Sequence, residues 1–404
     1  MRFPEFSGEW KVERLDEIAT LSKGIGISKE QVSNDGEPCI LYGELYTKYK
    51  SEIIKEISSR TNIDNSKLKR SKANDVIIPC SGETAVDIAT ARCVPFDNIL
   101  LGGDLNIISL YQYDGAFMSY QLNGKRKYDI AKVAQGVSVV HLYGEHLKAI
   151  STYNPCLQEQ QKIAKLLSLL DDRIATQNKI IEDLKKLKSA IIDKSFCYPN
   201  ESSPQKRFIG FTEEWHLVHL SDICQRVRTK NFNTQCTLVL TIAAQFGLVS
   251  QEEFFNKSVA SDNLEGYYLL RKGDFAYNKS YSGDYAWGAV KRLECFSEGV
   301  LSPLYICFRP DTARIDSDFL AHYFESKKWY KGIADIAGEG ARNHGLLNLS
   351  VIDYFKTLHR IPSIQEQKAI ANALNKLTSK ISIEKNLYDD LLLQRQHLLQ
   401  QMFI

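Results

Sequence analysis

The middle of each half of this chain carries basic, amide and aromatic side chains close to glycines, a combination that can bind nucleic acid. Glycine lets the backbone approach a ligand closely, lysine and arginine neutralise phosphates, and asparagine, arginine and glutamine can make paired hydrogen bonds to base edges. A charge run such as Lys125 to Lys127 is also what a solvated surface carries, so both interpretations stay open. We predict DNA-reading loops that contain Lys69, Arg70, Lys72, Ser81, Lys125, Arg126, Asn278, Lys279, Tyr281, Trp287, Arg342, Asn343 and His344.

Motifs for catalysis or nucleotide binding are absent from the sequence. A phosphate-binding loop needs G-x-x-x-x-G-K-[ST], and Gly124-Lys125 lacks the earlier glycine and the following hydroxyl residue. The segment Gly24-Ile25-Gly26 lacks the third glycine of a dinucleotide or methyl-donor fingerprint. A catalytic triad assembled only in space would leave no such signature. We expect a protein that is not an enzyme and that binds no cofactor.

The composition is that of an ordinary globular protein of 404 residues with a net charge of +2, so any basic surface has to be local. His216 and His219 could share a metal ion, but they lack neighbouring carboxylates or cysteines, which favours surface or capping histidines. The nine cysteines form no C-x-x-C pair, which indicates reduced thiols and no structural zinc. No stretch reaches the roughly 18 apolar residues that span a bilayer, so we expect a cytoplasmic protein.

The sequence contains an internal repeat in which the two halves of the chain correspond, and this repeat indicates that both halves have the same architecture. Its opening segment returns 205 positions later, and its Pro-x-x-Gln-Glu-Gln segment returns 207 positions later. The middle of each half differs. The opening matches join Arg2, Phe3, Phe6, Glu9, Trp10, Leu15 and Ile18 to Arg207, Phe208, Phe211, Glu214, Trp215, Leu220 and Ile223.

Each half ends in a long segment with the apolar spacing of a coiled coil. Apolar residues fall at 163, 167, 170, 174, 181, 184 and 191, and again at 370, 374, 377, 381, 388, 391 and 398. Each segment, 158–196 and 365–403, has no proline or glycine and would form a helix about 58 Å long. Because a single apolar stripe needs a partner, we expect the two helices to pair in antiparallel fashion about a pseudo-two-fold axis.

The remaining residues indicate an α+β fold with two tandem domains of mixed α and β structure. Short apolar runs at 75–78, 99–101, 105–110, 273–277 and 304–308 are typical of strands, and 318–331 is typical of a helix. The polar, proline-containing segment 198–206 is typical of a linker. The predicted boundaries are 1–155 for the first domain, 156–197 for the first helix, 198–206 for the linker, 207–361 for the second domain and 362–404 for the second helix.

With these residues in view, the chain resembles the specificity subunits of type I restriction-modification systems over its whole length. The resemblance rests on the entry tryptophans, on Asp75 and Asp274 before apolar strands, and on the late glycines Gly136 and Gly340. It also rests on a duplicated P-x-x-x-E-Q-x-x-I element, in which Ser363-Ile364 replaces Cys156-Leu157 in the second copy. This element is Pro155, Glu159, Gln160 and Ile163 in the first half and Pro362, Glu366, Gln367 and Ile370 in the second.

The resemblance implies two target recognition domains that each read one part of a split, asymmetric site in double-stranded DNA. It implies that methyl transfer and ATP-driven cleavage belong to two modification subunits and to restriction subunits, which assemble with this chain. A duplicated coiled-coil adaptor with protein- or glycan-binding domains is the alternative, and it would bind no duplex DNA. The helices would act as spacer and docking surface through Pro155, Glu159, Gln160, Ile163, Leu167, Leu170, Ile174, Pro362, Glu366, Gln367, Ile370, Leu374, Leu377 and Ile381.

Overall fold

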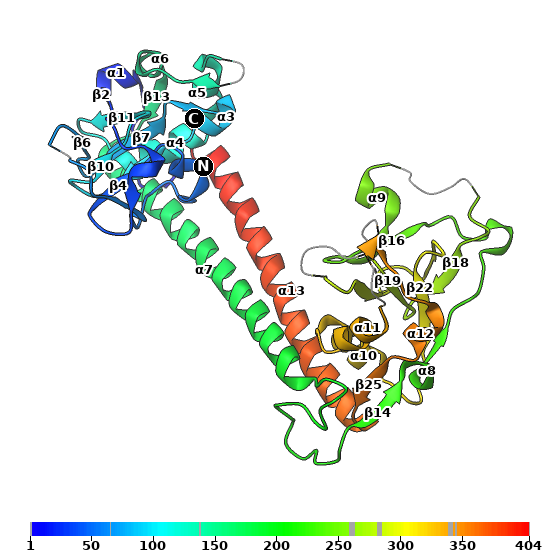
Figure 1. The fold of residues 1–404 in the computed structure, drawn as a ribbon. Coiled ribbons are helices and arrows are strands. Elements are labelled where there is room, and N and C mark those ends of the chain that lie inside the picture. Colours follow the sequence, from blue (N-terminus) through cyan, green and yellow to red (C-terminus); the bar gives the residue numbers. More distant parts are fainter. Residues whose placement is uncertain are drawn as a thin grey trace. The chain divides into compact units, whose positions relative to one another are not determined.

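The structure of this chain, a computed structural model, forms two compact units (Figure 1). Unit 1 comprises Met1–Lys179 with Lys385–Ile404, and unit 2 comprises Ile180–Glu384. Both chain ends lie in unit 1. The described residues are 2–64, 66–136, 139–257, 263–280, 285–337, 342–343 and 346–403, with the backbone alone at 342, 343 and 346.

Unit 1 contains a four-stranded antiparallel sheet between a layer of helices and a second, five-stranded sheet. In the central strand β7 (Asp75–Pro79), Val76 and Ile78 pack with Met118 of helix α4 (Gly115–Asn123), whereas Ile77 faces the second sheet. This alternation follows the two-residue period of a strand whose two faces are both buried. The four-stranded sheet has the order β2 (Ala19–Lys23), β11 (Leu105–Leu110), β7 and β9 (Arg92–Val94).

Shorter elements complete unit 1. The five-stranded sheet has the order β3 (Val32–Ser33), β5 (Ser59–Thr61), β4 (Glu37–Ile40), β10 (Leu100–Leu101) and β6 (Lys69–Arg70), and only the β4–β10 pair is parallel. Two-stranded pairs join β1 (Lys11–Arg14) to β13 (Ser151–Asn154) and β8 (Ser81–Gly82) to β12 (Val140–His141). The remaining helices are α1 (Leu15–Ile18), η1 (Lys29–Gln31), α2 (Glu44–Thr47), α3 (Ala85–Ile88), α5 (Lys127–Val133) and α6 (Gly144–Lys148).

Unit 2 repeats the central frame with different additions. Its four-stranded sheet has the order β15 (Cys224–Arg226), β22 (Ile306–Pro310), β19 (Phe275–Asn278) and β20 (Ala289–Arg292). The additions are the pairs β16 (Leu240–Ala243) with β17 (Gly247–Ser250), β18 (Tyr268–Arg271) with β21 (Glu298–Leu301), and β23 (Arg342–Asn343) with β24 (Leu346–Leu347). The strand β14 (His216–His219) pairs with β25 (Leu358–Ile361), and the helices are α8 (Leu220–Ile223), η2 (Phe232–Thr234), α9 (Gln251–Phe255), α10 (Ser317–Glu325), α11 (Tyr330–Ile336) and α12 (Val351–Phe355).

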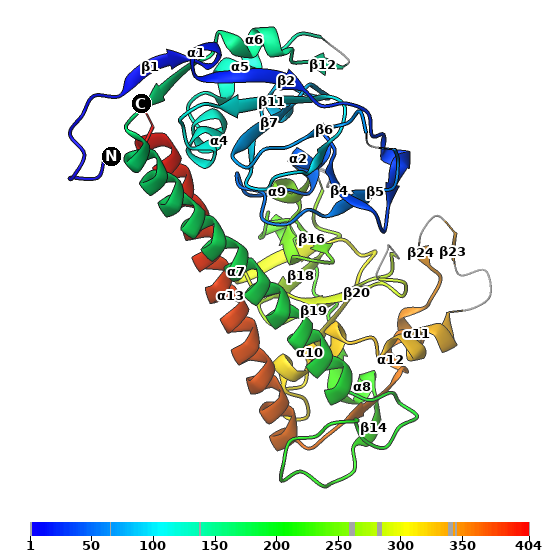
Figure 2. The same ribbon diagram turned by 90° about the vertical axis from the view of Figure 1, so that its left-hand side faces the viewer.

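The long helices α7 (Leu157–Ser195) and α13 (Ile364–Gln401) pack together, and Figures 1 and 2 both draw them side by side. In unit 1, Ile163 and Leu167 near the start of α7 pack in one cluster with Leu398 near the end of α13. In unit 2, Ile192 near the end of α7 shares a core with Ile370 and Leu374 near the start of α13. The pairing is therefore antiparallel in each unit, and the apolar spacing identified the buried seam.

Most of the predicted strands are confirmed, and one predicted helix is wrong in its extent. Strand β11 has the predicted bounds, while β19 and β22 begin two residues later than expected. The segment 318–331 is not a single helix, because α10 ends at Glu325 and α11 begins at Tyr330. Between them, the hydroxyl of Ser326 donates to the carbonyl of Tyr323, a side-chain to backbone bond that competes with continued helix. Within the described part of the chain, no helix is long and apolar enough to cross a membrane.

The fully buried His359 gives unit 2 a predictable sensitivity to acid. Its Nδ1 atom accepts from the Tyr323 hydroxyl at 2.9 Å, while Nε2 lies 2.8 Å from the Thr357 hydroxyl. The Thr357 hydroxyl donates to the carbonyl of Tyr354 at 2.7 Å, so Nε2 has to carry the proton and the ring is neutral. Burial, assisted by His219, lowers the pKa of His359 from 6.5 to about 3.

We expect the free energy of unfolding of unit 2 to fall as the pH drops from about 6.5 toward 3, because only the unfolded chain protonates His359 there. The loss should approach about 1.4 kcal/mol per pH unit at most. Urea unfolding at several pH values measures it, since Trp215, Trp287 and Trp329 all lie in unit 2. The variant His359→Gln should show a shallower pH dependence, whereas the exposed His397→Gln should match the unmodified chain. Equal slopes in all three proteins would contradict the assignment.

Candidate nucleic-acid interface

The start of each half is fastened to the start of its own long helix by a paired ion bridge. The Arg2 guanidinium donates to both carboxylate oxygens of Glu159 at 2.8 and 2.7 Å, and Arg207 does the same to Glu366 at 2.9 and 2.6 Å. Both glutamates are almost fully buried. A bidentate arginine–carboxylate pair fixes both the distance and the relative orientation of the two side chains. The repeated opening residues therefore position each domain on its helix.

The glutamine that follows each of these glutamates connects its long helix to a shorter helix of the domain, α4 in unit 1 and α10 in unit 2. Gln160 accepts the backbone N–H of Asp114 at 2.9 Å and donates to the carbonyl of Pro155 at 2.8 Å. Gln367 makes the equivalent bonds to Asp316 and Pro362 at 2.7 and 2.9 Å. These glutamates and glutamines, expected from the sequence to serve in docking or spacing, are buried inside the chain. Their contacts are internal, so a docked partner would have to use other residues of the helices.

The last residues of each helix complete the domain of the other half. Phe403, at the end of α13, packs on Phe117 of unit 1 with ring centroids 5.3 Å apart. Phe196, just after α7, packs on Phe319 of unit 2 at the same separation. Trp10 also packs on Phe117, and Trp215 packs on Phe319, with ring centroids 5.9 and 6.1 Å apart. Each hydrophobic core therefore depends on a helix end that the other half of the sequence encodes.

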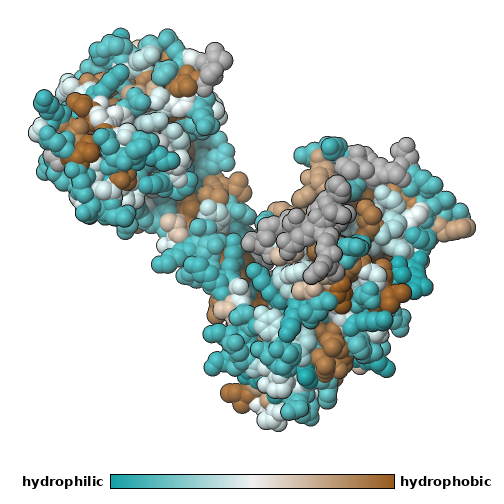
Figure 3. All heavy atoms as spheres, viewed as in Figure 1, coloured by the Kyte–Doolittle hydropathy of each residue, from teal (hydrophilic) through white to brown (hydrophobic). Residues whose placement is uncertain are grey.

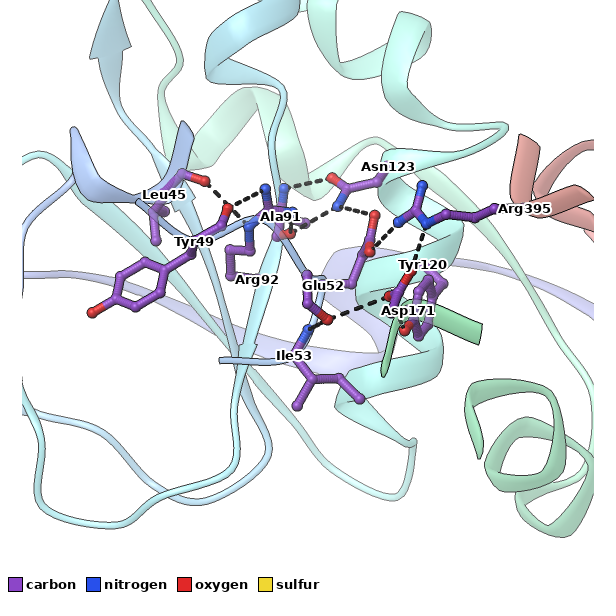
Figure 4. A network of polar contacts seen from close by, with 11 residues as sticks. Leu45, Tyr49, Glu52, Ile53, Ala91, Arg92, Tyr120, Asn123, Asp171 and Arg395 are labelled. Atoms are coloured by element: carbon purple, nitrogen blue, oxygen red, sulfur yellow. Dashed lines mark hydrogen bonds and ion pairs between the residues drawn. The ribbon is translucent and has the colours of Figure 1, made fainter. Parts of the chain in front are cut away.

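A buried polar network holds α13 against the first domain (Figure 4). The Arg395 guanidinium donates to Asp171 of α7 at 2.6 Å and also to Glu52. Tyr120 of α4 donates to the same Asp171 carboxylate at 2.6 Å, and Asn123 donates to Glu52 at 3.2 Å. Burial disfavours a charged guanidinium, but the attraction of the two carboxylates outweighs it and raises the pKa of Arg395. The sequence alone gave no sign of this network.

In unit 1, polar and aromatic side chains gather where β8 and β12 meet the end of β2. The predicted Ser81 lies 3.3 Å from the Asp104 carboxylate, through its hydroxyl. The rings of His141 and Tyr143 stack at 6.0 Å, and the Lys23 amine lies 5.5 Å above the Tyr143 ring. This Ser81 corner offers a cation, hydroxyls and an exposed ring, which are groups that bind phosphate and bases. Ser81 is among the residues predicted from the sequence, whereas Lys23, His141 and Tyr143 were not predicted, because they come from distant segments.

Glycines make this corner possible through close backbone contacts. A Cβ atom on Gly24 would lie 1.9 Å from the carbonyl oxygen of Gly102, and one on Gly82 would lie 2.4 Å from the Ile88 side chain. Neither position has room for a larger residue. The Gly24-Ile25-Gly26 segment, which failed as a dinucleotide motif, therefore serves to bring two backbones together below the surface.

The other basic residues predicted in unit 1 are dispersed. Arg70 in β6 donates to Glu37 at 2.7 Å, beside Lys69. The exposed Lys72 uses its backbone N–H to bind Asp75, which holds the turn before β7. Lys125 is exposed, whereas the Arg126 guanidinium lies 4.9 Å from the Tyr153 ring centroid and 3.4 Å from Asp129. These residues belong to separate elements and are not brought to the Ser81 corner by any described contact.

In unit 2, the predicted segment follows β19 as expected. Asn278 is the last residue of β19, and its side-chain oxygen accepts the backbone N–H of Ser280 at 2.9 Å. The carbonyl of Lys279 accepts from Leu347, which joins this loop to the β23–β24 pair. The partly buried Trp287 packs on the core, and its carbonyl accepts from Tyr277 at 2.8 Å. The backbones of Arg342 and Asn343 form β23, whereas Tyr281 and His344 lie outside the described residues.

A basic cluster that the sequence reading missed lies at the end of β15 and in the loop that follows. The Lys230 amine lies 4.0 Å above the ring of Tyr268, and Arg226 lies 3.4 Å from the hydroxyl of the same tyrosine. In sequence alignment with the first half, this loop corresponds to the segment that contains Lys23. Each domain thus places a lysine over a tyrosine ring near the end of the same edge strand.

The described residues offer no constellation for metal chemistry. No group of three or more His, Cys, Asp or Glu side chains in the described ranges could hold a metal ion. His219 caps α8, since its backbone N–H donates to Asp222 while its Nδ1 lies 2.8 Å from the carbonyl of Lys356. All nine cysteines are unpaired, and only Cys156 and Cys295 are exposed.

Comparisons with known proteins agree with this arrangement. Residues 7–186 match the family model described as the type I restriction modification DNA specificity domain. The MjaVIII type I restriction enzyme specificity subunit of Methanocaldococcus jannaschii is 24% identical over 409 residues, with 95% of this chain and 89% of the relative aligned. The search also finds the putative MjaX specificity subunit of the same organism, 35% identical over 79 residues that make up 19% of each chain.

Two solved structures share the fold. The S subunit of a type I restriction-modification system from M. genitalium superimposes with a TM-score of 0.59 and 19% identity, covering 100% of this chain and 97% of the other. A chain from a structural study of type I complex assembly and conformational transition gives a TM-score of 0.55 and 14% identity, covering 98% and 97%. Over nearly its whole length the chain is therefore similar to the specificity subunits of type I restriction-modification systems, and residues 7–186 match the DNA specificity domain of that family.

Proposed function

We propose that units 1 and 2 each contain one target recognition domain, and that each domain reads one half of a bipartite, asymmetric site in double-stranded DNA. The observation that supports this most is the combination of a duplicated frame with different additions. The Arg–Glu bridge, the glutamine bonds and the aromatic anchor occur twice, whereas the second layer of strands differs, with one five-stranded sheet in unit 1 and separate two-stranded pairs in the described part of unit 2. Two different surfaces on one frame suit two different half-sites.

The paired helices would set the distance between the half-sites and bind the other subunits of the complex, two modification subunits and the restriction subunits. Support comes from large apolar side chains that the helices leave exposed outside the seam. Leu169 and Leu187 on α7 are 52% and 51% exposed, and Ile383 and Leu393 on α13 are 61% and 64% exposed. A helix of a partner subunit that packs on these faces would bury them. The complex would act in the cytoplasm, on the cell's DNA.

An exchange of one domain tests the two-reader proposal. Residues 215–361 are replaced by the matching segment of a related specificity subunit, and the complex with modification subunits selects duplexes from a random library. We expect only one half of the selected site to change, because the other domain and the helices are untouched. Sequencing of the bound duplexes gives the result, and the unmodified chain is the reference.

Two outcomes of the exchange would count against the proposal. If both half-sites changed together, the two units would not be independent readers. If the unmodified complex selected no sequence, and if its affinity did not fall with added salt, duplex DNA would not be its ligand.

A further inference from the structure

A cleft of about 1090 Å³ lies in unit 1 next to the Ser81 corner. Its walls come from η1, α2, the start of β3, the ends of β4 and β5, and the turn before β11, and Figure 2 shows α2, β4 and β5 together at one end of the unit. In Figure 3 the visible face of unit 1 is mostly hydrophilic, with small separate hydrophobic patches. The polar and aromatic lining of the cleft includes Ser28, Lys29, Gln31, Tyr42, Tyr46 and Lys48, together with the carboxylates of Glu30, Glu44 and Asp104.

The walls of this cleft are fixed by internal bonds. The buried Glu44 carboxylate accepts the backbone N–H of Leu41 at 3.0 Å, the Lys48 amine at 2.6 Å and the Ser59 hydroxyl. These bonds hold α2 against the sheet and leave little freedom to the side chains that α2 presents. A cleft with rigid walls is suited to selecting a ligand by shape and hydrogen bonding.

One residue of the wall has a strained backbone. Ile27 has φ of 59°, in the left-handed region that β-branched side chains rarely adopt, whereas Asp104, with φ of 57°, is of a residue type that adopts this region readily. Strain of the kind seen at Ile27 costs on the order of 1–3 kcal/mol and collects at sites of function. Its presence in the wall of the cleft points to a surface shaped for a ligand.

Three polar groups in the cleft are available to a ligand. Among the described residues, the hydroxyls of Tyr42 and Tyr46 have no hydrogen-bond partner. The side-chain oxygen of Gln31 accepts the backbone N–H of Ser28 at 2.8 Å, and its amide nitrogen has no partner among the described residues. Burial, with smaller contributions from Tyr42, Glu83 and Asp87, raises the pKa of Tyr46, which keeps the phenol protonated. Both a hydroxyl and an amide nitrogen can donate to the acceptors on a base edge.

The cleft and the Ser81 corner form one continuous surface. A Cβ atom built on Gly82 would lie 3.8 Å from the Tyr46 hydroxyl, and Asp104 belongs both to the cleft and to the Ser81 contact. Lys29 lines the cleft and Lys23 lies at the corner, so two cations flank the unbound donors, whereas the Lys48 amine is bound to Glu44. Cations for phosphates beside donors for bases are what one strand of a duplex requires.

We propose that this cleft receives the base edges of the first half-site, with Tyr46 and Gln31 as specificity-determining residues. Lys29 contacts a neighbouring phosphate and carries no sequence information. The inference rests on the proposed function, because it assumes that unit 1 reads DNA. It goes further by assigning the reading of bases to residues that precede the predicted Ser81 loop by 35 to 50 positions.

The test uses the full chain assembled with modification subunits and duplexes selected from a random library. Tyr46→Phe removes one hydroxyl and keeps the ring, and Gln31→Glu keeps the oxygen that Ser28 binds while removing the donor. We expect each variant to lose preference at one base pair of one half-site, on the order of 10-fold, with the other half-site unchanged. Lys29→Met should weaken binding to all duplexes alike and reduce the salt dependence by about one counterion.

Tyr111→Phe is the matched control, since Tyr111 is 63% exposed and its hydroxyl lies 3.0 Å from Thr20, away from the lining of the cleft. Hydrogen exchange of unit 1 shows whether each variant is folded. Unchanged site preference in folded Tyr46→Phe and Gln31→Glu would overturn the inference, and so would an equal effect of Tyr111→Phe. An unmodified complex without any base preference would instead refute the proposed function, which separates the two failures.

Discussion

Replacement of Arg395 by methionine is expected to destabilise unit 1 by about 3–5 kcal/mol, although Arg395 lies only nine positions before the end of the chain. The change leaves the carboxylates of Glu52 and Asp171, each less than a tenth exposed, without the cation that binds them both. Buried charges that lose their partner keep the full cost of desolvation. Hydrogen exchange measures the effect locally, because amides of residues 1–179 should exchange faster while those of 180–384 should not.

Two further variants separate lost charge pairing from lost packing. Lys186→Met removes a helix cation whose pair with Asp183 is 3.9 Å long and exposed, and it should change stability by less than about 0.5 kcal/mol. Adding Glu52→Gln and Asp171→Asn to the Arg395→Met background should restore part of the lost stability, because neutral amides tolerate burial better than unpaired carboxylates. An Arg395→Met protein as stable as the original would show that the network of Figure 4 contributes nothing.

The second large effect is expected at the two phenylalanines that follow the long helices. Phe403→Ala should destabilise unit 1, and Phe196→Ala should destabilise unit 2, each by about 3–5 kcal/mol. Both rings are buried, and each packs on a phenylalanine of the domain encoded by the other half of the sequence. The loss should therefore appear in the opposite half from the one that encodes the mutated residue.

Hydrogen exchange resolved by unit checks this crossed pattern. The exposed Leu393→Ala on the same helix serves as a control for Phe403→Ala, since little packing is lost there. If Phe403→Ala accelerated exchange in 207–361 and left 1–155 unaffected, the assignment of the helix ends to the two cores would be wrong. Such a result would also remove the reason for treating the last residues of α13 as part of the first domain.

The sequence by itself determined the duplication, the two long helices and their buried seam, because these depend on periodicity along the chain. Residues spaced by 205 and 207 positions occupy equivalent places, as the bridges of Arg2 and Arg207 demonstrate. Strand β11 could also be predicted to the residue, because its apolar residues Leu105, Ile107 and Ile108 fall close together and are buried in the clusters on the two faces of the sheet. The resemblance to type I specificity subunits followed from the same repeated residues.

Only the tertiary structure decided which helix end completes which core and where polar groups converge. Arg395, Asp171 and Glu52 are separated by more than a hundred positions, and nothing in local spacing predicts that one cation meets both carboxylates. Likewise, Tyr46 of helix α2 and Gly82 of strand β8 approach each other only in the folded chain. Periodicity reports which face of an element is buried, whereas contacts between elements depend on how separate faces are packed, and that information is not local.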